Sequence, residues 1–208
     1  MNYLFKGDIP SDMLNNGDFD GDLAIDTETT GLDLLNRDRL CLVQVSNGNG
    51  NAHLVKFEKG VYDCPNLVKL LANDEVQKIF HYARFDILAI KKFLGVTLQN
   101  IFCTKIASRL CRTYTDKHGL KELCKEYLGN ELSKRQQTSY WGAEWLTKDQ
   151  IKYAANDVLF LHKIREKITW QLKNEDRLEI ALKCFDFLQT RMELDEIGYE
   201  PVDIFAHS

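Results

Sequence analysis

Short apolar runs separated by turn residues occupy the first third of the chain. They lie at 23–26, 40–45 and 52–57, and the stretch between the last two, at 47–51, reads Asn-Gly-Asn-Gly-Asn. Apolar runs of this length bounded by glycine and asparagine are typical of strands joined by tight turns. The pattern therefore predicts three consecutive strands that pair as an antiparallel meander.

After residue 65 the pattern alternates between helical and strand-like stretches. Helices are expected at 66–72, 85–94, 105–110 and 120–127, and short strands at 76–80 and 100–103. Gly129 should stop the last of these helices. Residues 131–145 show no clear period, so an ordered loop is predicted there.

The C-terminal third is predicted to be helical. Thr147 and Gln150 match a capping box, a pattern that opens helices by satisfying free backbone amides. One long helix should follow, and its apolar stripe is formed by Ile151, Ala154, Val158, Leu161 and Ile168. A second helix at about 176–194 precedes a short tail. No repeat or linker divides the chain, so we predict one α/β domain over residues 1–208.

The composition is that of an ordinary globular protein. The chain has 208 residues, of which 44% are hydrophobic, and this is enough to bury a sizeable core. No apolar run approaches the roughly 18 residues that a membrane helix needs, and the first residues lack the pattern of a signal peptide. We therefore expect no membrane association. The six cysteines are scattered without a C-x-x-C pair, which is typical of reduced thiols and a cytoplasmic location.

Four carboxylates and one tyrosine stand out in three short clusters. Asp26 and Glu28 follow an apolar run two positions apart, which places both on one face of a strand. Asp86 lies among apolar neighbours, where a buried carboxylate needs a partner. Tyr153 and Asp157 are four residues apart and share one helix face. Acids held together repel one another and lose hydration, and a hard divalent cation removes that cost. The clusters therefore predict a metal site.

Each cluster also has an ordinary interpretation. Asp26 and Glu28 could end a strand that faces water, and Asp86 could favour its helix through the macrodipole alone. Tyr153 and Asp157 could be boundary residues of an amphipathic helix. The order of all five along one chain favours the metal site over these separate explanations.

The order D-x-E, then Asp, then Y-x-x-x-D resembles the DEDD superfamily of 3′→5′ exonucleases. Tyr153 marks the DEDDy branch, because the DEDDh branch has histidine where this chain has Lys152. Stretches that resemble the ribonuclease D group lie at 81–86, 119–123, 136–141 and 153–158. Stretches that resemble the NrnC group of alphaproteobacterial nano-RNases lie at 102–108, 113–116 and 203–208. Tyr140 stands where related loops usually have aspartate, so no metal or proton-transfer role is assigned to it.

This resemblance implies an RNase H-like fold, a mixed central sheet flanked by helices, that holds two Mg²⁺ or Mn²⁺ ions. Asp26 would bridge the ions, Glu28 and Asp157 would complete the one that holds the attacking water, and Asp86 would hold the other beside the leaving oxygen. Two such cations suit phosphodiester hydrolysis to nucleoside 5′-monophosphates. Tyr153 would orient the water, because a phenol with an unperturbed pKa of about 10 is a poor base at neutral pH.

Substrate contacts are expected around the same motifs. The candidate residues are Thr29, Gly31, Leu32, His81, Arg84, Gln136, Ser139 and Trp141. Leu32 is placed to wedge against a base, and Arg84 is suited to a bidentate phosphate contact. A solvent-facing position is an equal alternative for His81, and core packing is the commoner fate of a tryptophan such as Trp141.

Proteins of the NrnC group act on very short RNA, particularly dinucleotides, and assemble as rings of subunits. The resemblance therefore implies a dinucleotide-cleaving exoribonuclease and a homo-oligomer, with a ring-shaped octamer as the expected form. A net charge of −4 argues against non-specific binding of long nucleic acid and is compatible with a substrate of few phosphates. One alternative is a ribonuclease D-like enzyme that trims longer RNA or DNA. The other is a catalytically silent RNA-binding module, which would typically have lost one of the acids.

Overall fold

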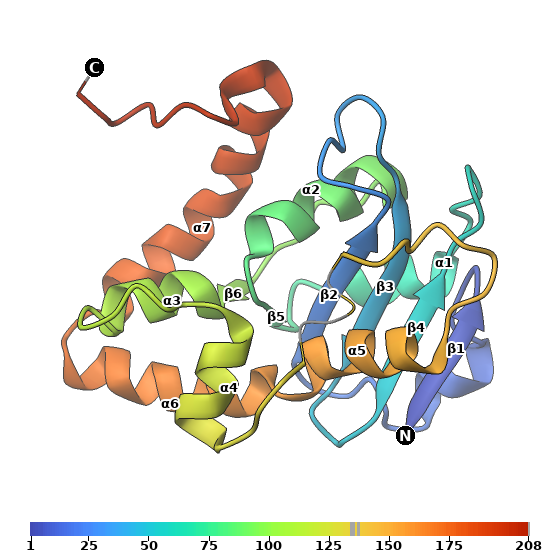
Figure 1. Ribbon diagram of the computed structural model, residues 1–208, viewed down its shortest axis with the longest axis horizontal. Helices are drawn as coiled ribbons and strands as arrows, with labels where there is room; N and C mark the ends of the chain where they lie inside the picture. The colour runs from blue at the N-terminus through green and yellow to red at the C-terminus, as the bar shows by residue number, and fades with distance from the viewer. Residues whose placement is uncertain (134–135, 137, 208) are drawn as a thin grey trace.

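A mixed sheet runs through the middle of the molecule with helices on both faces (Figure 1). The structure is a computed structural model that describes residues 1–133, 136 and 138–207. Within them the sheet has six strands in the order β1-β4-β3-β2-β5-β6. The strands are β1 Asn2–Lys6, β2 Leu23–Thr29, β3 Leu40–Ser46, β4 Ala52–Lys56, β5 Lys78–Phe80 and β6 Ile101–Cys103. The predicted α/β fold with a mixed, helix-flanked sheet is confirmed.

The predicted antiparallel meander is also confirmed, because β3 pairs antiparallel with both β2 and β4. Strands β5 and β6 extend the sheet parallel to β2. The sequence analysis missed β1, which pairs in parallel with β4 from Asn2↔Ala52 to Lys6↔Lys56. The alternation in β1 is short and only partly buried, so its place in the sheet depends on a partner about fifty residues away.

The helices agree with the predicted stretches to within a few residues, with one exception. They are α1 Pro65–Leu71, α2 Ala83–Leu94, α3 Thr104–Cys111, α4 Leu120–Leu128, α5 Lys148–Leu159, α6 Leu161–Asn174 and α7 Leu178–Leu194. Short turns of other helix types lie at Ser11–Asn15 and Asp195–Tyr199. The predicted capping box is present: Gln150 N donates to Thr147 Oγ1 (3.2 Å), and Thr147 N donates to Gln150 Oε1 (2.9 Å).

The exception is the single long helix predicted after Thr147, which the structure divides at Phe160 into α5 and α6. The two halves bury their apolar stripes in different layers. Helix α5 packs on the sheet against β1, β2, β3 and β4, whereas α6 packs against α3, α4 and α7 and contacts the sheet at β5. A continuous stripe in the sequence therefore predicted one helix where a turn redirects the chain.

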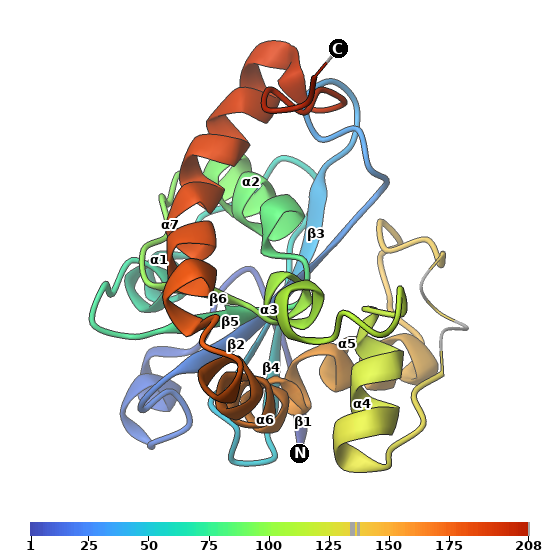
Figure 2. The same cartoon turned by 90° about the vertical axis from the view of Figure 1, so that its left-hand side faces the viewer.

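The two faces of the sheet carry different helices. Figure 2 shows α5 on one side of the sheet and α1 with α2 on the other, and α2 contacts β2, β3, β5 and β6. Helices α3, α6 and α7 form a second layer beyond the β6 edge (Figure 1). Because β2, β5 and β6 are parallel, their carboxyl ends meet at one edge of the sheet, where ligand sites of such sheets are usually found.

Between α4 and α5, the described residues contain no helix or strand. The ordered loop predicted at 131–145 includes residues 134, 135 and 137, which lie outside the described residues. Among the helices that the structure describes, none combines the length and apolarity needed to cross a bilayer.

Candidate active site

Three carboxylates meet where β2 and α5 cross. Asp26 and Glu28 lie two residues apart in β2 and therefore point to the same face of the sheet. This is the face that α5 covers. Asp157 of α5 reaches the same point. Each of the three offers an oxygen atom, and these oxygens lie within 4.8 Å of one another. Such a group of hard oxygen donors is suited to a cation such as Mg²⁺.

Asp86 approaches from α2, on the other side of β2. It lies in the first turn of the helix and is only 4% exposed. Thr27, which alternates with the two acids of β2, donates a hydrogen bond from its Oγ1 to Asp86 Oδ1 at 2.6 Å. The turn into α2 is made by Tyr82, whose φ of 76° is in the left-handed region. Strand and helix thus both fix the position of the fourth acid.

The four acids disfavour one another's ionised forms. Burial raises the pKa of Asp26 to about 7. Burial, followed by repulsion from the other three acids, raises the pKa of Glu28 well above its ordinary value. Burial and the charge of Asp26 do the same to the pKa of Asp86 and of Asp157. A cluster of this kind must hold protons or a cation, and its donor set fits a divalent cation.

Tyr153 lies one helical turn before Asp157, and its phenol interacts with that carboxylate. Burial, and then the charges of Asp157, Glu28 and Asp26, raise the pKa of this phenol above its ordinary value. The phenol is therefore protonated at neutral pH and acts as a hydrogen-bond donor. Its ring packs against Trp141, with the ring centroids 6.1 Å apart.

A cavity of about 680 Å³ opens beside the cluster. Of the candidate substrate contacts, those that line it are Thr29, Gly31, Leu32, His81, Ser139 and Trp141. Leu32 is 84% exposed and so is free to meet a ligand, whereas Trp141 is 2% exposed and packs in the core as well as forming part of the wall. Gly31 approaches Asp38 so closely that a Cβ atom would lie 2.5 Å from its carboxylate.

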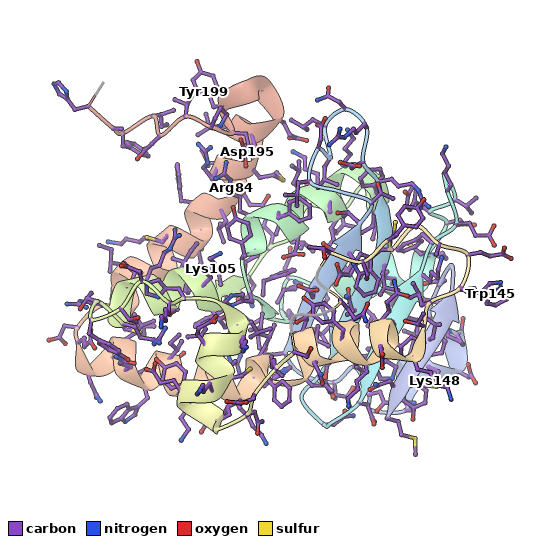
Figure 3. The ribbon with its side chains drawn as sticks, viewed as in Figure 1. Arg84, Lys105, Trp145, Lys148, Asp195 and Tyr199 are labelled. Atoms are coloured by element: carbon purple, nitrogen blue, oxygen red, sulfur yellow. The ribbon has the colours of Figure 1, made fainter. Side chains whose placement is uncertain are left out.

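Arg84 and Gln136 are not among the described residues that line this cavity. Arg84 instead donates Nε and Nη2 to the two carboxylate oxygens of Asp195, each at 2.6 Å, and Nη2 also donates to the backbone oxygen of Glu200. Figure 3 shows Arg84 and Asp195 together below the C-terminal segment. The guanidinium expected to bind phosphate is thus engaged by a residue 111 positions away in the sequence.

Sequence reasoning missed several residues of the cavity wall, among them Tyr82, Lys105 and Lys121. Lys105 Nζ lies 4.2 Å from the centroid of the Tyr82 ring, and Figure 3 places Lys105 at the start of α3. A signal for Lys105 exists in the sequence. It follows the predicted strand at 100–103 as His81 follows the predicted strand at 76–80, and residues that follow parallel strands gather at one edge of the sheet.

The comparison with known proteins agrees with this arrangement. Residues 6–173 match the sequence profile of the 3′–5′ exonuclease family. The chain belongs to this family. Among solved structures, Brucella melitensis NrnC bound to pGG is 47% identical, with a TM-score of 0.93 over 100% of this chain and 99% of that chain. Brucella melitensis NrnC with bound Mg²⁺ is 46% identical, with a TM-score of 0.92 over 100% of both chains.

More distant relatives of this exonuclease confirm the RNase H-like fold and the ribonuclease D relationship. Escherichia coli RNase D is 25% identical, with a TM-score of 0.77 over 93% of this chain and 51% of that chain. Ribonuclease D of Acidiphilium cryptum is 32% identical over 140 residues, 67% of this chain and 35% of that protein. DNA polymerase I of Aquifex aeolicus is 34% identical over 169 residues, 81% of this chain and 26% of that protein. The chain thus spans about a quarter to a third of these two curated relatives.

Proposed function

We propose that this exonuclease is a divalent-metal-dependent 3′→5′ exoribonuclease that hydrolyses very short RNA, particularly dinucleotides, to nucleoside 5′-monophosphates. The observation that carries the proposal is the cluster of Asp26, Glu28 and Asp157 oxygens within 4.8 Å at the wall of the cavity, with Asp86 and Tyr153 beside it. The NrnC structure with bound Mg²⁺ supports the use of a divalent cation.

The acids would serve as metal ligands, and Tyr153 would serve as a hydrogen-bonding group. Asp26, Glu28 and Asp157 would hold one Mg²⁺ or Mn²⁺ ion, and Asp86 would hold a second together with Asp26. When bound, such ions lower the pKa of a coordinated water and neutralise charge on the phosphate. Tyr153 keeps its proton at neutral pH because its pKa is raised, so it would orient the attacking water by a hydrogen bond without acting as the base.

The cavity wall offers groups that suit a short ribonucleotide. Lys105 and Lys121 bring positive charge to the wall, where they would contact substrate phosphates. Leu32 is exposed beside the acids and would wedge against a base. The rest of the wall includes Thr29, Gly31, His81, Ser139 and Trp141, which we propose as further substrate contacts. Arg84 is left out of this set because Asp195 engages it.

Three observations favour a dinucleotide over a long chain. The cavity volume of about 680 Å³ falls within the range of about 300–1,000 Å³ that is usual for small-molecule sites. A net charge of −4 is unusual for a binder of long nucleic acid. The relative bound to pGG, a two-base ligand, covers 100% of this chain.

The test is a length series of 5′-labelled RNAs, from two to about twenty nucleotides, incubated with the protein and Mn²⁺ or with EDTA. The dinucleotide should be cleaved far faster than the longer RNAs, and EDTA should abolish cleavage. Asp26→Asn should be inactive because it removes one carboxylate charge from the cluster. Glu166→Gln is the matched control, since this exposed acid of α6 lies outside the site, and it should cleave at the wild-type rate.

The same series, run also with matched deoxyribonucleotides, tests two other classes of substrate. Stepwise trimming of long RNA that leaves the dinucleotide would indicate the ribonuclease D-like function, which the similarity to Escherichia coli RNase D favours. Faster cleavage of matched deoxyribonucleotides would indicate a DNA exonuclease, which the similarity to DNA polymerase I favours. Cleavage of no length by the wild-type protein would leave the silent RNA-binding module as the better description.

We propose three further properties on separate grounds. The chain would act as one exonuclease domain, because one sheet joins β1 at its start to β6 and the helices around it. It would work in the cytoplasm, since its six cysteines are free thiols. It would assemble as a homo-oligomer, because its C-terminal segment exposes apolar side chains that a neighbouring subunit would cover.

A further inference from the structure

Gln44 is a polar residue in a strand whose other positions are mostly apolar. Strand β3 reads Leu-Cys-Leu-Val-Gln-Val-Ser, and every residue in it is buried. Gln44 is 0% exposed and lies directly opposite Asp26 in the antiparallel pair of β2 and β3. Because opposite residues of two paired strands point to the same face of a sheet, the amide of Gln44 is directed to the face that carries the acids.

Only one of the two polar atoms of this amide is hydrogen-bonded. Nε2 donates to Asp26 Oδ2 across 3.4 Å, whereas Oε1 is buried and has no hydrogen-bond partner within the part of the chain that the structure describes. A buried amide oxygen without a donor destabilises a fold. Methionine is of similar length and would fill this position without that cost, so packing alone does not explain the glutamine.

The neighbouring groups indicate what could satisfy Oε1. The carboxylates of Asp26, Glu28 and Asp157 are acceptors only when they are ionised, as they must be to hold a cation. With a cation bound, none of these acids can donate to Oε1, and a water held with the cation would provide a donor. Groups that hydrogen-bond to metal ligands and metal-bound water orient both of them.

We infer that Gln44 is a positioning residue of the carboxylate cluster. Its Nε2 fixes the orientation of Asp26, and its Oε1 accepts a hydrogen bond from a water held at the cation site. This role rests on the proposed function, because it requires a cation at Asp26. It predicts that removing the amide weakens metal binding even though Gln44 is not itself a ligand.

The test measures Mn²⁺ binding to the metal-free full chain by calorimetric titration, without substrate. Gln44→Met keeps the length of the side chain and removes both polar atoms, and it should weaken Mn²⁺ binding about 10–100-fold. Ser46→Ala is the matched control. Ser46 is buried two positions further along β3 and donates to the backbone oxygen of Asn51, so its loss should leave Mn²⁺ binding unchanged.

Thermal unfolding of the same metal-free proteins separates a positioning role from a merely structural one. Gln44→Met should unfold at the wild-type temperature or above it, because removing the buried amide oxygen that has no donor offsets the loss of the 3.4 Å hydrogen bond to Asp26. A lowered unfolding temperature with unchanged Mn²⁺ affinity would overturn the inference. Gln44→Asn covers the case of a methionine variant that fails to fold: it withdraws the amide by one methylene group and should also weaken Mn²⁺ binding.

Asp26→Asn and the wild type are titrated with Mn²⁺ in the same experiment. Their results distinguish a failure of the proposed metal site from a failure of the proposed role of Gln44. A wild-type chain that binds no Mn²⁺, or an Asp26→Asn variant that binds it as tightly as the wild type, would contradict the metal site and the role of Gln44 with it. Tight wild-type binding that is lost in Asp26→Asn but retained in both Gln44 variants would contradict only the role of Gln44.

Discussion

Protonation of single carboxylates links the stability of the metal-free protein to pH. The folded-state pKa of Asp26 is raised to about 7, far above the value of an unfolded aspartate. A carboxyl group of this kind stabilises the fold in its protonated form. Its contribution to the free energy of unfolding is fully present at pH values below the unfolded-state pKa, and it is lost as pH rises through about 7. Metal-free protein should therefore become less stable between pH 5 and pH 8, relative to a variant in which this position cannot ionise.

Asp26→Asn is that variant, and thermal unfolding in EDTA is the measurement. Between pH 5 and pH 8 the unfolding temperature of the wild type should fall relative to that of Asp26→Asn by roughly 5–10 °C. Mn²⁺ should reverse most of the fall at pH 8, because it binds only the deprotonated cluster. Parallel pH curves for the two proteins would show that Asp26 is not protonated at neutral pH in the folded chain.

The raised pKa of Tyr153 leads to a separate prediction about turnover. Because the phenol is protonated at neutral pH, Tyr153→Phe removes a hydrogen-bond donor and no base. We expect kcat for the dinucleotide to fall about tenfold or more, with KM little changed and with the pH–rate profile keeping its shape. Tyr62→Phe removes a phenol that donates to the Leu40 backbone oxygen outside the cavity, and it should leave kcat unchanged. A pH–rate profile that changed shape only in Tyr153→Phe would identify the phenol as the base.

At the scale of elements, the Arg84–Asp195 pair joins the first turn of α2 to the segment that follows α7. Asp195 is 3% exposed and also pairs with Arg191 at 2.9 Å, so removing Arg84 would leave part of a buried charge network unpaired. Tyr82 and Asp86 lie two residues either side of Arg84, so loosening this turn should disturb both the cavity wall and the fourth acid. We expect Arg84→Met and Asp195→Asn to lower kcat by similar factors.

A double-mutant cycle distinguishes this positioning role from direct phosphate binding by Arg84. The double variant should be little worse than either single variant, because both remove the same link. If Arg84 bound phosphate, Arg84→Met would raise KM while Asp195→Asn would not. The exposed pair of Lys91 and Glu196 also joins α2 to this segment, at 2.8 Å. Surface pairs contribute little, so Lys91→Met serves as the control and should keep the wild-type kcat.

Elements defined by local signals could be predicted from the sequence, and those defined by distant partners could not. The capping box at Thr147 and Gln150 is complete within four residues, and the structure contains it. Strand β1 depends on pairing with β4, and the turn at Phe160 depends on α6 packing against α3 and α4. The local pattern of apolar residues does not indicate either of these contacts.

The same division applies to the site. The sequence analysis identified the four acids because carboxylates with this spacing and order along the chain are suited to a shared cation. The pairing of Arg84 with Asp195 spans 111 positions, so the local sequence could not predict it. The left-handed φ of Tyr82 could not be predicted either, because tyrosine rarely adopts this conformation. Gln44 was missed because its role follows from its register with Asp26, which only the paired strands reveal.

At the scale of the whole molecule, apolar side chains of α7 and of the segment after it remain exposed. Ile197 is 71% exposed and Phe205 is 77% exposed, and Val202 and Ile204 lie between them in the sequence. The Phe205 ring lies 5.9 Å from that of Phe187 on α7, so the tail and the helix present one apolar surface. Contiguous surfaces of this kind commonly mark protein–protein contacts, which supports the proposed homo-oligomer.

Ending the chain after Val202 removes the apolar end of this surface and should therefore weaken assembly. We expect the wild-type protein to have a mass in solution that is a multiple of the 24.1 kDa chain, and the truncated protein to shift toward 24.1 kDa, measured by light scattering after size exclusion. Ile204→Ser with Phe205→Ser should shift the mass in the same direction at full length. Asp203→Asn, which keeps both apolar side chains, should assemble like the wild type. A wild-type mass of one chain would contradict the homo-oligomer, and an unchanged oligomer in both tail variants would place the contact between subunits elsewhere on the molecule.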